Sequence, residues 1–107
     1  MKNETIQWFK EVHIDNEPME RKLYLSSVYF NILSYDELLK SQDFFEIARV
    51  NDICYDLLEL SQKELGMFSS TTKTLNDSWY RISHVLFETS RKERETLSKS
   101  LHDIATL

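Results

Sequence analysis

Apolar residues recur along this chain at intervals of three and four, the spacing that places them on one face of an α-helix. The first such segment begins after Asn3, a residue type suited to capping a helix. The second opens near Pro18, because proline is tolerated in the first turn of a helix. The apolar surface over residues 19–33 is broad, so we expect this second helix to pack on two sides. Its apolar positions are Met19, Leu23, Leu25, Val28, Tyr29, Phe30, Ile32 and Leu33.

The middle of the chain predicts a further long helical segment. Ser34 and Glu37 have the spacing of a capping box, which predicts a helix start. The helix that follows is expected to run to Leu65 or to break near residues 41–43. Gly66 is the single glycine of the chain and falls where a left-handed C-terminal cap would lie.

The last third predicts two more helices. Thr74 is expected to cap the first of them. Residues 88–96 hold no aliphatic side chain, and Ser90 and Glu93 repeat the capping-box spacing, so we expect a break or a solvated stretch there. The whole pattern predicts an all-α, compact bundle of about five helices in one domain, residues 1–107. The apolar stripes of the last two helices are Leu75, Trp79, Ile82 and Leu86, then Leu97, Leu101 and Ile104.

Composition supports a helical class and indicates a compartment. The chain of 107 residues has one Gly and one Pro, too few for the many turns of a sheet protein, and 41% apolar residues, enough for one core. Cys54 is the single cysteine, so no intrachain disulfide forms. The polar N-terminus lacks a signal core, and no run of about 18 apolar residues could cross a membrane. We therefore expect a cytoplasmic bacterial protein.

The charge of the chain is concentrated in its middle third. The net charge is −5, and residues 34–68 hold eight acids against three bases, which gives −5 for that segment alone. Nucleic-acid binding requires clustered Lys and Arg, so nucleic acid is disfavoured as a ligand. A basic protein is the partner that this charge favours.

Residues that could carry out chemistry are scarce. His84 and Glu88 lie four apart and could both reach one metal ion, but zinc needs three or four ligands. Cys54 shares an apolar stripe with Val50 and Leu58, so we expect it to be buried and unreactive. A single glycine leaves no phosphate-binding loop. We therefore predict no enzyme activity, no metal or cofactor, and no small-molecule substrate.

The outward face of the helix predicted over residues 36–65 is the candidate binding surface. A tyrosine among acids on adjoining turns suits docking on a basic protein, because charge steers the encounter and the aromatic ring supplies binding energy. The alternative is that this face is only solvated. A weaker indication is that Tyr80 and Phe87 lie off their own stripe, either packing on the last helix or contacting a partner. The predicted binding residues are Asp52, Tyr55, Asp56 and Glu59.

These observations favour a small acidic protein that binds and inhibits another protein. The most concrete version is an immunity protein that neutralises a cognate bacterial toxin, such as a nuclease. In size and acidity the chain is similar to the immunity proteins of colicin-type and contact-dependent inhibition toxins, although no residue motif assigns it to a family. The alternative is a phage or plasmid regulator, or a helical adaptor, that docks on a host protein. The sequence does not indicate the oligomeric state.

Overall fold

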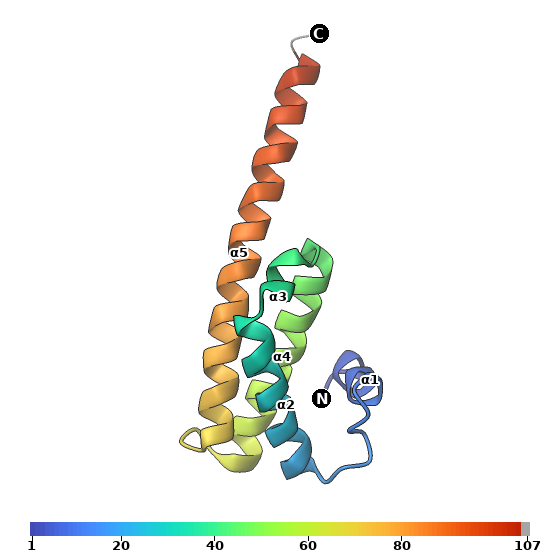
Figure 1. Cartoon of the computed structure of the whole chain (residues 1–107), viewed down its shortest axis with the longest axis vertical. Coiled ribbons are helices and arrows are strands. Elements are labelled where there is room, and N and C mark those ends of the chain that lie inside the picture. The colour runs from blue at the N-terminus through green and yellow to red at the C-terminus, as the bar shows by residue number, and fades with distance from the viewer. Residues whose placement is uncertain (106–107) are drawn as a thin grey trace.

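The computed structural model describes residues 1–105, which form five helices and no strand, so the predicted all-α class is confirmed. Helices α2, α4 and α5 pack side by side, α3 connects α2 to α4, and α1 lies against the outer flank of α4 (Figure 1). No helix within the described residues is both long enough and apolar enough to cross a membrane. The helices are α1 (Asn3–Glu11), α2 (Met19–Tyr35), α3 (Glu37–Ser41), α4 (Phe44–Leu65) and α5 (Ser70–Ala105).

The core lies between the inner faces of the three long helices. Small buried serines let these helices approach closely, and their hydroxyls donate to carbonyls of the preceding turn. Ser26 donates to the carbonyl of Lys22 (2.6 Å), and Ser78 to that of Thr74 (2.8 Å). No buried polar side-chain atom of the described residues is left without a partner. The core side chains that are 1% exposed or less are Leu23, Phe30, Leu39, Ile47, Ile53, Cys54, Leu57, Leu75 and Ile82.

Aromatic side chains attach α1 to the bundle. Trp8 and Phe9 are both 2% exposed. The ring of Trp8 stacks on Phe30 of α2 at 5.0 Å between centroids and meets the edge of Tyr29 at 5.2 Å. Aromatic pairs at these distances stabilise a packed element beyond the area that they bury. The predicted capping role of Asn3 is wrong, since Lys2 occupies the cap position and no side chain caps α1 there.

Two residues with positive φ end helices. Gly66 ends α4 with φ 88°, as the sequence predicts, although its ψ of 160° makes the cap extended rather than left-handed helical. His13 has φ 61° after the end of α1. The His13 amide donates to the Lys10 carbonyl (3.2 Å), and the Ile14 amide donates to the Phe9 carbonyl (2.9 Å). This is the hydrogen-bond pattern of a Schellman cap, with histidine where glycine is usual.

The middle segment breaks at Gln42 and Asp43, one of the two alternatives that the sequence left open. Asp43 caps α4 by accepting a hydrogen bond from the backbone amide of Glu46 (2.9 Å). The predicted capping role of Ser34 is wrong, because Ser34 lies inside α2 and Asp36 caps α3 instead. Asp43 lies three residues before Glu46, and an Asp at this position accepts a hydrogen bond from a first-turn amide of the helix as a Ser would.

The last helix differs most from the prediction. The cap expected at Thr74 is wrong, because α5 begins at Ser70 and Ser69 accepts the amide of Thr72 (3.1 Å). Of the two alternatives predicted for residues 88–96, the break is wrong, since α5 continues unbroken to Ala105, and the solvated stretch is confirmed, since most of these residues are exposed. At about 1.5 Å per residue its 36 residues span about 54 Å. Residues 91–105 are all exposed, and we name them the arm. The end of α5 extends well beyond the other helices in Figure 1.

Candidate binding surface

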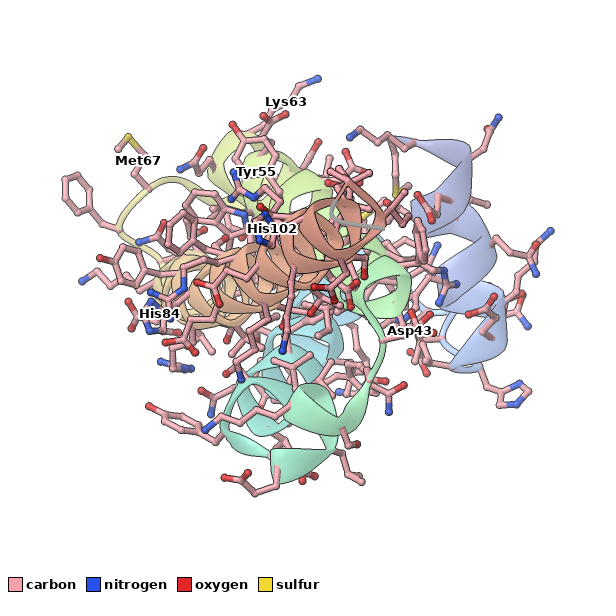
Figure 2. The ribbon with its side chains drawn as sticks, turned by 90° about the horizontal axis from the view of Figure 1, so that it is seen from above. Asp43, Tyr55, Lys63, Met67, His84 and His102 are labelled. Atoms are coloured by element: carbon pink, nitrogen blue, oxygen red, sulfur yellow. The ribbon has the colours of Figure 1, made fainter. Side chains whose placement is uncertain are left out.

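The predicted residues of α4 divide between two sides of the helix. α4 turns its inner face to α2 and α5, and one flank to α1. The remaining side is open to solvent, and Tyr55 and Lys63 project from it in Figure 2, away from α2. Asp52, Tyr55 and Glu59 are exposed on this open side, whereas Asp56 is half-buried on the flank that meets α1.

Asp56 is occupied within the protein. Its Oδ2 accepts hydrogen bonds from the backbone amide of Lys2 (3.0 Å) and from the hydroxyl of Thr5 (2.6 Å), which is fully buried. A carboxylate at the start of a helix also interacts favourably with the helix dipole. Asp56 therefore fixes the N-terminal end of α1 on α4. A partner would have to compete with these contacts to use the Asp56 carboxylate.

Arg49 fixes the other end of α1 in the same manner. Its guanidinium contacts Glu11 at 2.7 Å, Glu46 at 3.4 Å and Glu4 at 3.6 Å. The hydrogen bond to Glu11, together with the charges of the three carboxylates, raises the pKa of Arg49 despite partial burial. Three acids on this flank are thus engaged by one guanidinium, which compensates part of their charge, so these carboxylates are not free to bind a partner.

Tyr55 is held in place at the border of the open side. Its ring lies 5.3 Å from the ring of Trp79 on α5, yet the residue remains 41% exposed. A hydrogen bond to Glu59, reinforced by the carboxylate charge, raises the pKa of Tyr55. Within residues 1–105, neither Asp52 nor Glu59 forms a salt bridge. The open side therefore offers an oriented aromatic ring between two carboxylates that no base neutralises.

Two further aromatic residues are exposed on α5. Asn51 donates a hydrogen bond to the hydroxyl of Ser83 (2.8 Å), which marks the side of α5 that faces α4. Tyr80 and Phe87 lie three residues before and four residues after Ser83, beside this boundary. They are 72% and 62% exposed, and no separate last helix covers them because α5 is continuous. We name the surface formed by Asp52, Tyr55 and Glu59 the acidic aromatic face.

α2 carries a second exposed apolar surface, which the sequence pattern alone does not reveal. The broad apolar pattern of this helix predicts packing on two sides, and α2 does contact both α5 and α4, but part of its apolar surface remains exposed. α2 lies across α5 from Tyr55 in Figure 2, so the two surfaces face different directions. The signal was present in the sequence, but the pattern does not show whether the chain itself covers a second stripe. The exposed residues are Tyr24, Val28, Ile32 and Tyr35, at 53%, 40%, 62% and 70%.

The residues considered for chemistry form no reactive arrangement. His84 Nε2 lies 3.2 Å from the Glu88 carboxylate, and both side chains are exposed. No group of three potential metal ligands exists among residues 1–105. Cys54 is fully buried, as predicted, and burial raises the pKa of its thiol to about 12. A thiol with this pKa is almost wholly protonated at neutral pH and is a poor nucleophile.

Comparisons with known proteins add no assignment. No protein-family model, curated protein or solved structure matches the chain. The inference of function therefore depends on the surfaces of the molecule itself. Among them, the acidic aromatic face combines negative charge with an oriented aromatic side chain.

Proposed function

We propose that this protein binds and inhibits a basic protein through its acidic aromatic face. The observation that supports this proposal is the arrangement around Tyr55, whose ring packs on Trp79 and stays 41% exposed between Asp52 and Glu59. A side chain ordered before binding loses less conformational entropy when the complex forms. Aromatic anchors of this kind supply much of the binding energy in protein interfaces.

The carboxylates on this face are expected to act on the association rate. Asp52 and Glu59 are exposed and form no salt bridge within residues 1–105, so their field extends into solvent and attracts a positively charged surface. An enzyme that acts on nucleic acid carries such a basic surface, because it must neutralise phosphates. An acidic protein docked there would block access of the substrate without any catalysis or cofactor.

The most specific form of the proposal is an immunity protein in the bacterial cytoplasm, which neutralises a toxin of the nuclease class. Such a protein needs to fold without a metal or a disulfide, and the core described above uses neither. The alternative is a regulator or adaptor that docks on a host protein. The apolar outer side of α2 supports this alternative, because an adaptor needs a second docking surface.

The test begins with affinity capture of the partner by the full chain and continues with a binding titration. The double variant Asp52→Lys/Glu59→Lys reverses the charge of the face. A matched control, Glu20→Lys/Glu64→Lys, makes the same change in net charge on exposed residues elsewhere. Glu64 is nine residues from Tyr55, which is two and a half turns and therefore the opposite side of α4.

We expect the face variant to slow association at least about tenfold, while the control changes it by less than about threefold. Added salt should weaken wild-type binding more than binding of the face variant. Equal affinities for the face variant and the control would show that the partner binds elsewhere. A growth assay with the captured partner distinguishes an immunity protein from a regulator. A toxin stops growth when it is expressed alone and is tolerated when the wild-type protein is expressed with it. A regulated host protein is not toxic.

A further inference from the structure

Arg81 of α5 is a half-buried cation without an acidic partner. Within residues 1–105 no salt bridge includes it, although Asp77 lies one turn earlier on the same helix, a spacing at which ion pairs commonly form. By contrast Arg49, which is also half-buried, contacts three carboxylates. A charge withdrawn from water is usually paired, because an opposite charge offsets the cost of its desolvation. In the described part of the chain, no carboxylate does this for Arg81.

Contacts with neutral groups fix the Arg81 guanidinium at the end of α2. Nε donates to the hydroxyl of Ser34 (3.0 Å), and Nη2 donates to the side-chain oxygen of Asn31 (2.9 Å). The ring of Tyr35 covers one side of the guanidinium, with 4.0 Å between Cζ and the ring centroid. The C-terminal end of a helix also favours a nearby cation. The side chain is therefore ordered before any ligand binds, which lowers the entropy cost of binding.

The third nitrogen of the guanidinium, Nη1, is open to solvent. The hydrogen bonds of Arg81 within residues 1–105 use Nε and Nη2 and leave Nη1 without a partner. Every buried polar side-chain atom of the described residues has a partner, so Nη1 must reach solvent. Its two N–H groups are therefore free to bind a ligand.

A pocket of about 420 Å³ lies beside this nitrogen, between α2 and α5. Two further donors line it, since a tyrosine hydroxyl can donate a hydrogen bond and a histidine ring donates through both nitrogens when it is protonated. His84 lies at the edge of the molecule opposite α1 in Figure 2, and its Nε2 is 3.2 Å from Glu88, which is not part of the lining. No acid lines the pocket. The lining residues are Ser34, Tyr80, Arg81, His84 and Val85.

The free donors suit a tetrahedral phosphate better than a planar carboxylate. Arginine binds a carboxylate most strongly with two parallel hydrogen bonds from two of its nitrogens. Nε and Nη2 are already bound to α2, so Arg81 offers a ligand one nitrogen. Phosphate oxygens point in several directions, so each can accept from a different residue around the pocket. A phosphoryl group also carries a charge of about −1.5 to −2 at neutral pH, which strengthens such hydrogen bonds.

We propose that this pocket binds the phosphoryl group of a phosphate monoester. Arg81 Nη1, the Tyr80 hydroxyl and the His84 ring donate to the phosphate oxygens, and no bond is made or broken. Val85 and the ring of Tyr80 supply apolar surface for the organic group of the ester. The proposal goes beyond the proposed function, and the pocket shares no residue with the acidic aromatic face. Either proposal can therefore fail without the other.

The charge of the chain limits the expected affinity. A net charge of −5 repels an anion at long range, although salt at about 0.15 M screens charges beyond about 8 Å. The attraction to Arg81 acts at contact and is screened less. We therefore expect a dissociation constant on the order of 1 mM for a small monoester.

A nuclear magnetic resonance titration of the full chain with phenyl phosphate, at constant salt and neutral pH, tests the pocket. We expect saturable shifts of the backbone amides of residues 80–85, and Arg81→Gln should weaken binding at least about tenfold. The control Arg21→Gln removes the same charge from an exposed arginine of α2 and should bind like the wild type. A wild type without saturable shifts, or an Arg81→Gln variant that binds like the control, would overturn the proposal.

Two other substitutions test the pocket without removing the contacts that Arg81 makes with α2. Tyr80 and His84 are exposed, so Tyr80→Phe and His84→Gln should leave the helix content and the stability unchanged. Each should weaken the binding of phenyl phosphate at least about threefold, because each removes one donor. These variants decide the question if Arg81→Gln fails to fold. Unchanged affinity in both would refute the arrangement of donors proposed here.

Related ligands test the chemical class. Benzoate carries a carboxylate on the same ring and should bind at least about fivefold more weakly than phenyl phosphate. Inorganic phosphate lacks the organic group and should bind at least about threefold more weakly. A peptide that carries phosphotyrosine distinguishes a free monoester from one on a protein, since only the peptide can gain contacts outside the pocket. Binding of benzoate or inorganic phosphate as tight as that of phenyl phosphate would refute the assignment to a monoester.

Discussion

The two halves of α5 have similar apolar spacing and opposite surroundings. Leu75 and Ile82 in the first half are fully buried, whereas Leu97 and Leu101 in the arm are about 60% exposed. Periodicity specifies that a helix has an apolar side. Whether that side is covered depends on how far the neighbouring helices extend, and α4 covers α5 only as far as the level of Phe44.

The same contrast occurs between two acids of α4 that lie one turn apart. Asp52 is open to solvent, whereas Asp56 accepts hydrogen bonds from Lys2 and Thr5. Thr5 is 51 residues away from Asp56 in the sequence, so helical position alone does not distinguish the two acids. Covered and uncovered members of such pairs should respond differently to substitution.

The largest difference between the two halves of α5 is expected in the loss of stability when an apolar side chain is truncated. Ile82→Ala leaves a cavity in the core and should lower the free energy of unfolding by about 2–5 kcal/mol. Leu101→Ala removes a side chain that is already in water and should change it by less than about 0.5 kcal/mol. Urea denaturation measures both. Comparable losses would mean that the arm is packed on the body in solution.

Thiol labelling should distinguish the covered interface from the arm. Cys54 lies between α4 and α5 with its pKa raised to about 12, so its labelling at pH 8 should be as slow as unfolding. An added thiol at Ser98→Cys, on the arm, should react within the mixing time of the reagent. Cys54→Ser buries a hydroxyl in place of the thiol and should cost about 1–3 kcal/mol of stability. Fast labelling of the native Cys54 would contradict its buried position.

Removal of the carboxylate should affect the stability of the protein differently at Asp52 and at Asp56. Asp56→Ala breaks the hydrogen bonds that hold α1 and should lower the free energy of unfolding by about 1–2 kcal/mol. Asp52→Ala should change it by less than about 0.5 kcal/mol. Both variants place alanine in the same helix, so helix propensity cancels in the comparison. Equal effects would show that α1 does not depend on Asp56.

The smallest effect is expected at the end of α1. His13→Gly removes the cost of a positive φ in a residue with a side chain, offset by the greater freedom of glycine in the unfolded chain. We expect a gain of about 0.5 kcal/mol, seen as a rise in Tm of about 2–4 °C. His13→Ala is the matched control, since it keeps the strained conformation and should bring no gain.

The sequence predicts the elements of this fold better than their limits. The stripe around Cys54 correctly predicts its burial, and Gly66 ends α4 as expected. The break predicted at Ser90 and Glu93 is wrong because capping-box spacing occurs by chance inside a helix. Residues 88–96 contain neither Gly nor Pro, so nothing in the backbone interrupts α5, and a solvated helix needs no core stripe.

The candidate surface was predicted in part. Asp52, Tyr55 and Glu59 share the open side of α4 as helical geometry requires, and their role in binding stays a prediction. The attachment of α1 to Asp56 and Arg49 could not be derived, because it depends on contacts between residues far apart in sequence. The exposure of the outer side of α2 could not be derived for the same reason.

The unbroken course of α5 fixes a rotational phase between the arm and the body. Each residue of a helix turns the chain by about 100° and advances it by about 1.5 Å. One residue inserted between Glu88 and Lys92 would therefore move Leu97 and Leu101 a short distance along the axis but rotate them by a quarter turn or more relative to the bundle. Seven inserted residues would lengthen the arm by two turns and restore its direction to within about 20°. An insertion in helix α5 should therefore act mainly through the direction in which the side chains of the arm point, and less through the length of the helix.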